Sequence, residues 1–183
     1  MDIVKNFKLI KKTITDNVQI IAVSKTKSKD EILKIYNIGH KNFGENKIQE
    51  LKEKYNQLPK DIKWHMIGHV QRNKVKYIAP FIELIHSVDS LKLMLEINKQ
   101  GEKNKRTIKC LLQIKIANEE NKFGLFKDEV ENLISLSNNL NYIKIIGLMG
   151  MATYTNNDKI IDREFKEIYN LFKILKISHK QLY

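Results

Sequence analysis

Six times along the chain, an apolar segment precedes a segment whose apolar residues recur at helical spacing. The apolar segments are VQIIAVSKT (18–26), KNFGEN (41–46), IKWHMIG (62–68), IELIHSV (82–88), TIKCLLQIKIA (107–117) and YIKIIGLMGMA (142–152). The helical segments that follow begin near residues 28, 47, 70, 90, 127 and 162, and a further helix precedes the first strand. This alternation predicts a parallel α/β sheet covered by helices on its outer face, either doubly wound or closed into a barrel.

The length and composition of the chain predict one domain over residues 1–183. Its 183 residues are 42% hydrophobic, which is enough for one core, and only two prolines and no Ser/Gly-rich linker interrupt them. The single cysteine, Cys110, allows no intramolecular disulfide and fits a reducing compartment. No apolar run approaches the roughly 18 residues of a membrane span. We therefore expect a cytoplasmic protein without a membrane partner. We also expect a monomer.

The formal net charge of +12 raises nucleic-acid binding as an alternative function. Only three of the 33 basic residues are arginine, and the lysines are spread along the chain among many Asn and Ile residues. We interpret this composition as a bias toward AT-rich codons. Because no helix carries a basic face interleaved with aromatic residues, nucleic acid is a minority interpretation and we expect no nucleic-acid partner.

Small and polar residues gather where the predicted strands pass into their helices. They are Ser24-Lys25-Thr26, Gly44-Glu45-Asn46, Gly68-His69, Ser87-Val88-Asp89, Asn118 and Met149-Gly150-Met151. In a parallel barrel these positions form one carboxyl-terminal rim, which is where barrel enzymes carry their active sites. Glycine and asparagine also occur in such turns for backbone reasons alone, so a single residue of this set is weak evidence for a ligand.

Other common sites lack their sequence signals. GENKIQE is not a phosphate-binding Walker loop, and no G-x-G-x-x-G motif is present. The five histidines have no acidic or cysteine partner at metal-ligand spacing, and no serine stands in a nucleophile-elbow context. We therefore expect no metal site and assign no catalytic residue.

Five motifs, in order, carry a family resemblance. AVSKTKS, FGENKIQE, KWHMIGHVQRNK, LLQIKIANEENKFGL and IIGLMGMATYT resemble those of the pyridoxal-phosphate-binding homeostasis proteins, single-domain relatives of the alanine racemase barrel. The resemblance spans nearly the whole chain. It implies a (β/α)8 barrel of the TIM type in the cytoplasm, with pyridoxal 5'-phosphate (PLP) as cofactor, a role in intracellular PLP homeostasis, and PLP-dependent apoenzymes as candidate partners.

The resemblance also implies the site residues. It places PLP as a Schiff base on the lysine of the first strand, which here is Lys25. An amine reacts with an aldehyde only when neutral, and desolvation at the end of an apolar strand favours that form, so we expect Lys25 rather than Lys27 to react. By position, Asn46 is expected to hydrogen-bond the cofactor and Met149 to pack against its ring. His65 is a further candidate, whereas His69 receives no role.

The sequence departs from the family at its carboxyl end. A complete barrel has eight strands in about 250 residues, whereas this chain shows about six βα units and lacks the S-x-G-M-S and R-I-G segments that, by resemblance, hold the phosphate and the pyridine nitrogen. We therefore expect a barrel domain that is incomplete at its carboxyl terminus, either as a fragment or as a shortened protein. A PLP carrier without turnover is the leading interpretation, and a PLP-dependent amino-acid racemase is the alternative enzyme.

Overall fold

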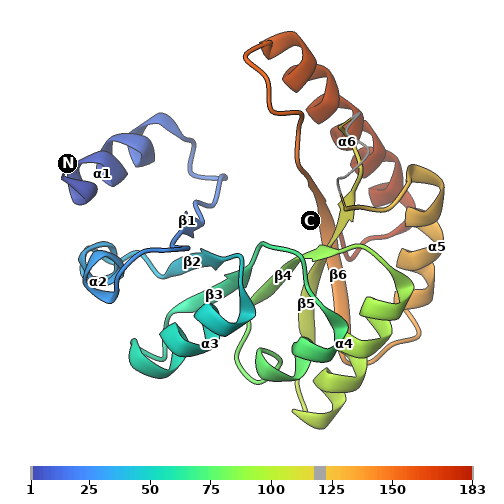
Figure 1. The fold of residues 1–183 in the computed structure, drawn as a ribbon. Coiled ribbons are helices and arrows are strands. Elements are labelled where there is room, and N and C mark those ends of the chain that lie inside the picture. The colour runs from blue at the N-terminus through green and yellow to red at the C-terminus, as the bar shows by residue number, and fades with distance from the viewer. Residues whose placement is uncertain (1, 118–122, 183) are drawn as a thin grey trace.

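The computed structural model describes residues 2–117 and 123–182, and these form a parallel sheet covered by helices (Figure 1). The sheet has six strands in the order β1-β2-β3-β4-β5-β6, and every neighbouring pair is parallel. The strands are β1 (Ala22–Val23), β2 (Asn42–Glu45), β3 (Lys63–Met66), β4 (Leu84–Val88), β5 (Ile108–Ile114) and β6 (Ile143–Gly150). The α-helices are α1 (Ile3–Thr13), α2 (Lys29–Tyr36), α3 (Ile48–Gln57), α4 (Leu91–Lys103), α5 (Lys127–Ser137) and α6 (Asp158–Ser178), and η1 (Arg72–Tyr77) is a 3-10 helix.

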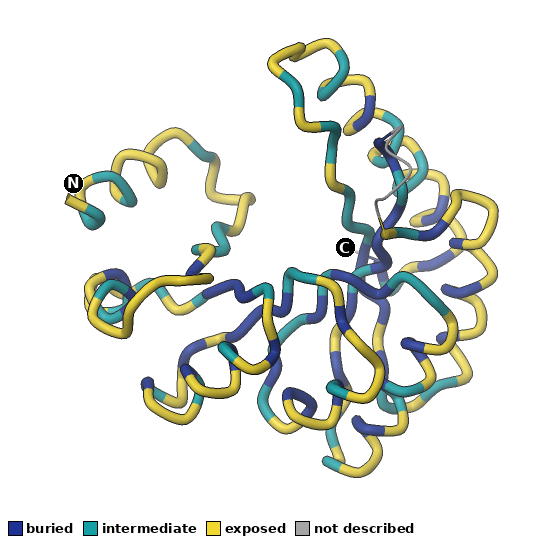
Figure 2. The backbone as a smooth tube through the Cα atoms, in the orientation of Figure 1, coloured by how far each residue is buried: buried dark blue, intermediate teal, exposed yellow. Residues whose placement is uncertain are grey.

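The sheet is a curved arc with helices α2 to α5 along its outer side (Figure 1). Because side chains alternate along a strand, one set of strand residues faces these helices and the other set faces the inside of the arc. Phe43, Trp64 and Met66 belong to the helix-facing set, and all are at most 1% exposed. They pack with Leu51 and Ile97 of the helices in one hydrophobic cluster. Figure 2 shows many buried residues along the sheet and many exposed residues on the outer helices.

The expected helix starts are confirmed at two caps. The hydroxyl of Ser28 accepts a hydrogen bond from the N–H of Glu31, and the Glu31 carboxylate accepts one from the N–H of Ser28. Ser90 caps α4 through the N–H of Leu93. These caps satisfy backbone donors that have no partner inside the helix. They fix the point at which each chain segment leaves the rim of the sheet.

Three elements differ from the sequence prediction. Helix α6 begins at Asp158, four residues before the expected start at residue 162. The expected strand over residues 18–26 pairs only at Ala22 and Val23, which are in register with Phe43 and Gly44 of β2, and a turn closed by the N–H of Lys27 and the carbonyl of Ser24 follows directly. The expected α-helix over residues 70–79 is the six-residue 3-10 helix η1. Pro80 follows this segment and cannot continue a hydrogen-bonded helix, so the turn stays short and buries Val75.

β1 and β6 are the two ends of the sheet, and within residues 2–117 and 123–182 they do not pair with each other. The order and direction of the strands confirm an α/β barrel-type fold over the six units.

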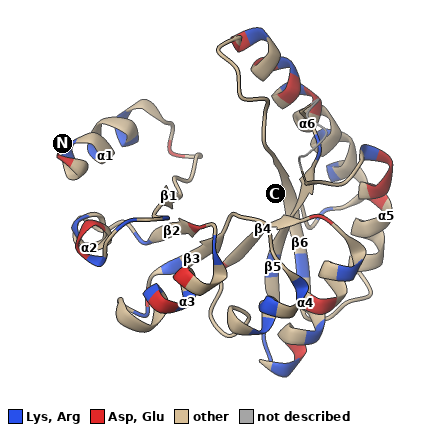
Figure 3. Cartoon of the chain, viewed as in Figure 1, with Lys and Arg blue, Asp and Glu red and all other residues tan. Residues whose placement is uncertain are grey.

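No helix in the described part of the chain is long and apolar enough to cross a membrane. Lysine and arginine are distributed over many elements and interspersed with acidic residues (Figure 3).

Candidate functional site

Lys25 lies in a tight turn just after β1. The N–H of Ser24 donates to the carbonyl of Gly44 in β2 (2.9 Å), and the N–H of Lys27 donates back to the carbonyl of Ser24 (3.0 Å). Within this turn Thr26 has a φ of 63°, in the left-handed region that is uncommon for residues other than glycine. The turn therefore has a defined and locally strained backbone, with Lys25 between its two anchored neighbours.

Lys25 is exposed. The expectation that the end of the first strand removes its side chain from water is therefore wrong. The reason is the shortness of β1, which ends at Val23 and leaves Lys25 two residues beyond the sheet, at its edge. No hydrogen bond or ion pair joins the Lys25 amine to another described residue, whereas Lys27 pairs with Glu31 at 3.3 Å. The amine of Lys25 is thus available to a ligand, and that of Lys27 is engaged.

A buried polar cluster lies beneath this turn. The Lys54 amine donates to the carbonyl oxygen of Ser24 (2.6 Å), to Oε1 of Glu45 (2.7 Å) and to Oε1 of Glu50 (2.7 Å). The side chain of Lys54 is 8% exposed and that of Glu45 is fully buried. Glu45 also accepts a hydrogen bond from the Ser24 hydroxyl (2.7 Å), and Glu50 accepts one from the N–H of Thr26 (2.7 Å). We call Glu45, Glu50 and Lys54 the turn-anchoring cluster.

The two carboxyl groups of this cluster differ electrostatically. Burial raises the pKa of Glu45, and the hydrogen bonds from Lys54 and Ser24 act in the opposite direction. The hydrogen bond from Lys54 lowers the pKa of Glu50, and burial, which raises it, is the smaller effect. Oε2 of Glu45 is buried and has no hydrogen-bond partner among the described residues. The lowered pKa of Glu50 keeps its carboxylate negatively charged near pH 7. The ionised form of Glu45 depends on the hydrogen bond from Lys54.

Asn46 lies directly after β2, half-buried, at the same end of the sheet as Lys25. Its position depends on Gly68 after β3. A Cβ atom on Gly68 would stand 2.4 Å from the backbone oxygen of Asn46 and 2.7 Å from its Cα atom, far inside contact distance. Glycine is required at residue 68 because the two rim segments approach so closely.

The sheet does not bring Met149 next to Lys25. Met149 is half-buried in β6, where it lies in register with Gln113 of β5. The order of the strands puts β6 and β1 at opposite ends of the sheet. Asn118, another rim residue expected from the sequence, lies outside the described residues.

His65 belongs to a buried pair of histidines on the inner side of the sheet. Nδ1 of His65 is 3.0 Å from Nε2 of His86, and Nε2 of His65 is 3.3 Å from Oδ1 of Asn42. One assignment satisfies every contact: His86 donates to His65, which donates to Asn42. Burial lowers the pKa of His65 to about 3 and that of His86 to about 4, and the neighbouring ring and Lys63 also lower the pKa of His65. Both rings are therefore neutral near pH 7.

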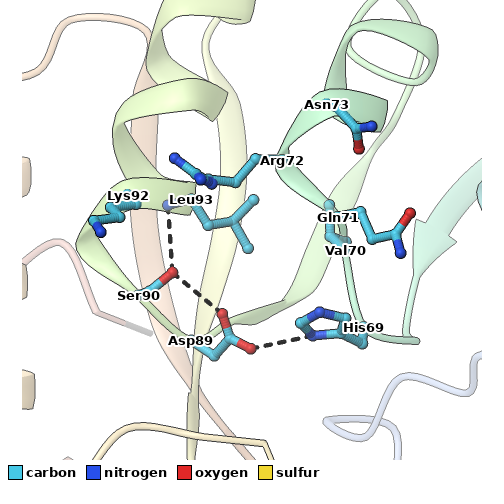
Figure 4. Close-up of a pocket in the computed structure, with 9 residues that line it drawn as sticks. All are labelled: His69, Val70, Gln71, Arg72, Asn73, Asp89, Ser90, Lys92 and Leu93. Carbon is cyan, nitrogen blue, oxygen red and sulfur yellow. Dashed lines mark hydrogen bonds and ion pairs between the residues drawn. The ribbon is translucent and has the colours of Figure 1, made fainter.

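A separate pocket of about 560 Å³ opens between η1 and the start of α4 (Figure 4). Its base holds His69, whose Nδ1 is 3.2 Å from a carboxylate oxygen of Asp89, and the His69 ring stacks on Phe123 at 4.0 Å. Arg72 and Lys92 line it from two sides. In residues 2–117 and 123–182 no group of three or more metal-ligating side chains is present. His69 thus has an acidic partner that its sequence neighbours did not indicate.

The comparisons with known proteins identify the family of this chain. The sequence profile of the alanine racemase N-terminal domain matches residues 2–181. The pyridoxal phosphate homeostasis protein of Helicobacter pylori is 38% identical over 162 residues, which are 87% of this chain and 73% of that protein. This chain belongs to that family. The family assignment confirms the resemblance carried by the five motifs.

Two solved structures show the same architecture. PipY of Synechococcus elongatus, solved with PLP bound, has a TM-score of 0.89 and 27% identity, and the match covers 99% of this chain and 85% of PipY. Alanine racemase of Clostridium difficile has a TM-score of 0.80 at 15% identity over 95% of this chain and 46% of the racemase, which shows the fold alone. The α/β barrel-type fold expected from the sequence is therefore confirmed.

Sequence reasoning missed the turn-anchoring cluster. The i,i+4 spacing of Glu50 and Lys54 was a visible signal for a helix-surface ion pair. Nothing in the sequence indicated that Lys54 is buried or that it reaches Glu45 and Ser24, which lie nine and thirty residues earlier. Lysine is rarely buried, so its expected place was the solvated face of the helix.

Proposed function

We propose that this chain binds PLP and acts in intracellular PLP homeostasis. One observation carries the proposal: from an anchored turn at the carboxyl end of β1, Lys25 presents an amine that is paired with no other described residue. The similarity to pyridoxal phosphate homeostasis proteins and to PipY with PLP supports the identity of the cofactor. In this proposal Lys25 holds PLP as a Schiff base.

The residues at this end of the sheet fit such a ligand. PLP supplies an aldehyde, which condenses with a primary amine with loss of water, and a flat heteroaromatic ring that withdraws electrons. Lys25 supplies the amine, and Asn46 supplies an amide that can donate to a ring oxygen or accept from a ring N–H. Gly44 lies between Ile21 and Ile67, whose side chains would be 3.0 Å from a Cβ atom there, so this part of the sheet is apolar and closely packed.

The other proposed residues have weaker support. Met149 is five strands from β1, so a contact with the same cofactor requires the sheet to curve around it. His65 is 2% exposed and its ring nitrogens already contact His86 and Asn42. We propose that His65 links β2 to β4 through its contacts with Asn42 and His86, and that any effect of His65 on PLP is transmitted through those two residues.

We propose a carrier role in preference to racemase activity. Racemisation needs an acid and a base on opposite faces of the substrate carbon, and of the residues proposed to touch PLP directly, which are Lys25, Asn46 and Met149, only Lys25 is an acid or a base. PLP-dependent apoenzymes are the proposed recipients, and the reduced thiol of the buried Cys110 fits a cytoplasmic location. Incorporation of solvent deuterium at the α-carbon of alanine, lost in Lys25→Ala, would favour the racemase instead.

The proposal is tested by trapping the lysine that reacts. The protein is incubated with PLP, reduced with borohydride, digested and mapped by mass spectrometry. We expect the phosphopyridoxyl group on Lys25, and its loss in Lys25→Ala with the fold retained. Lys29→Ala is the matched control, because Lys29 is also an exposed lysine, at the start of α2. Labelling scattered over the exposed lysines, unchanged by Lys25→Ala, would contradict the proposal.

A further inference from the structure

The turn-anchoring cluster contacts the peptide units on both sides of Lys25. The Lys54 amine binds the carbonyl of Ser24, which precedes Lys25, and the Glu50 carboxylate binds the N–H of Thr26, which follows it. Glu45 binds the hydroxyl of Ser24. The three members also contact one another through Lys54, so the contacts to the turn come from one connected unit.

Burial of these charged side chains carries a desolvation cost, which their mutual contacts must offset. An ion pair removed from water often stabilises a fold less than apolar side chains of the same size. Lys54 is 7% exposed and Glu45 is 0% exposed, so both have lost nearly all contact with solvent. In exchange, the cluster supplies charged groups that hold Ser24 and Thr26 at hydrogen bonds of 2.6 to 2.7 Å.

The backbone of the turn shows what these contacts achieve. Thr26 has a φ of 63°, a conformation that a residue with a Cβ atom leaves readily unless it is held. The hydrogen bond from its N–H to Glu50 holds it in that conformation. Since Lys25 stands between Ser24 and Thr26, the start of its side chain is fixed even though the side chain itself is exposed.

We propose that Glu45, Glu50 and Lys54 are positioning residues for Lys25, which direct its amine toward the aldehyde of PLP. This inference rests on the proposed function, and it concerns a different set of residues from those that touch the cofactor. Lys54 itself is not a site of PLP attachment, because its amine is buried and makes three hydrogen bonds. A shift of about 1 Å in a reacting group can lower a rate roughly 100-fold, so loss of the cluster should be measurable.

The test compares the initial rate of phosphopyridoxyl labelling at Lys25 with that at Lys29 in the same sample. We expect Lys54→Met and Glu50→Ala to lower this ratio about 10-fold or more, and Lys54→Arg, which keeps the charge and donors, to recover much of it. Glu53→Ala is the matched control, because Glu53 is exposed on the same helix as Glu50. A folded Lys54→Met protein with an unchanged ratio would overturn the proposal.

Two further measurements separate this inference from the proposed function. Hydrogen exchange at the N–H of Thr26 should accelerate about 10-fold or more in Glu50→Ala, because its acceptor is gone. Acetic anhydride labelling should show an altered reactivity of Lys25 in the same variant without any PLP. If the wild-type protein formed no adduct at Lys25, the proposed function would fail, and these two measurements would still decide whether the cluster positions Lys25. If Lys54→Met does not fold, the partly exposed Glu50 decides the outcome.

Discussion

Replacing Lys54 with methionine should destabilise the protein strongly, because it leaves the Glu45 carboxylate buried without its cation. The two side chains are 8% and 0% exposed, and the Lys54 amine is 2.7 Å from Glu45 Oε1. Breaking a buried pair by removing one partner costs about 3–5 kcal/mol. For a chain of this size each kcal/mol corresponds to about 2–4 °C, so the melting temperature should fall by roughly 6–20 °C.

The cost of Lys54→Met should also depend on pH, and the sign follows from Glu45. Burial already raises the pKa of Glu45, and removal of Lys54 takes away the group that opposes this rise. Between the ordinary carboxyl pKa of 4.5 and the raised value, the native state binds more protons than the unfolded state. The free energy of unfolding therefore falls as pH rises through this range. The variant should be closest to wild type near pH 5 and furthest from it near pH 8.

Urea unfolding at pH 5 and pH 8 measures both effects, and the double variant Glu45→Gln/Lys54→Met identifies their cause. Because the second substitution removes the stranded charge, the double variant should be more stable than the sum of the single losses by about 1 kcal/mol or more. Lys52→Met is the matched control, since Lys52 is exposed on the same helix. A cost for Lys54→Met below about 1 kcal/mol, or one that is the same at both pH values, would refute the reasoning.

Three further predictions concern the strand ends and the inner side of the sheet. Lys25→Ala should abolish the specific PLP adduct and change the melting temperature little, because Lys25 is exposed; loss of the folded circular-dichroism signal would argue for a structural role. Below pH 6.5 the unfolded state binds protons that the neutral His65 and His86 do not, so the free energy of unfolding should fall by up to about 1.4 kcal/mol per pH unit for each ring, and less steeply in His86→Gln. Gly68→Ala should lower the melting temperature and the PLP adduct yield together, since its Cβ would stand 2.4 Å from the Asn46 oxygen; a variant with wild-type values for both would contradict this close approach.

Much of the fold was predictable because hydrophobic periodicity is a local property of the sequence. The helix expected over residues 127–137 matches the bounds of α5, and all six strands form in chain order. The local sequence pattern did not predict the lengths of β1 and η1, which depend on other segments of the chain. β1 is limited to the two residues in register with Phe43 and Gly44 of β2, and Pro80 limits the length of η1.

The candidate site was predictable only in part. Lys25 and Asn46 stay predictions: they were selected because polar residues at the ends of parallel strands share one rim, and a motif resemblance singled out the lysine. The exposure of Lys25 and the engagement of Lys27 by Glu31 depend on where the turn leaves the sheet. The pairing of His65 with His86 depends on the register between β3 and β4, which no local pattern reports.

The sequence by itself determined the alternation of strands and helices, the approximate starts of most helices and a lysine at the end of the first apolar segment. These follow from side chains that act within a few residues of one another. Only the tertiary structure decided that Lys54 is buried, that it links Glu45 to Glu50, and that this cluster holds the turn around Lys25. A contact between Lys54 and Ser24, thirty residues apart, forms only when α3 packs against the sheet and its lysine leaves the solvent. Burial and long-range pairing arise from the packing of distant segments, and these decide which of the many lysines in this chain are solvated, which are paired, and which are available to react.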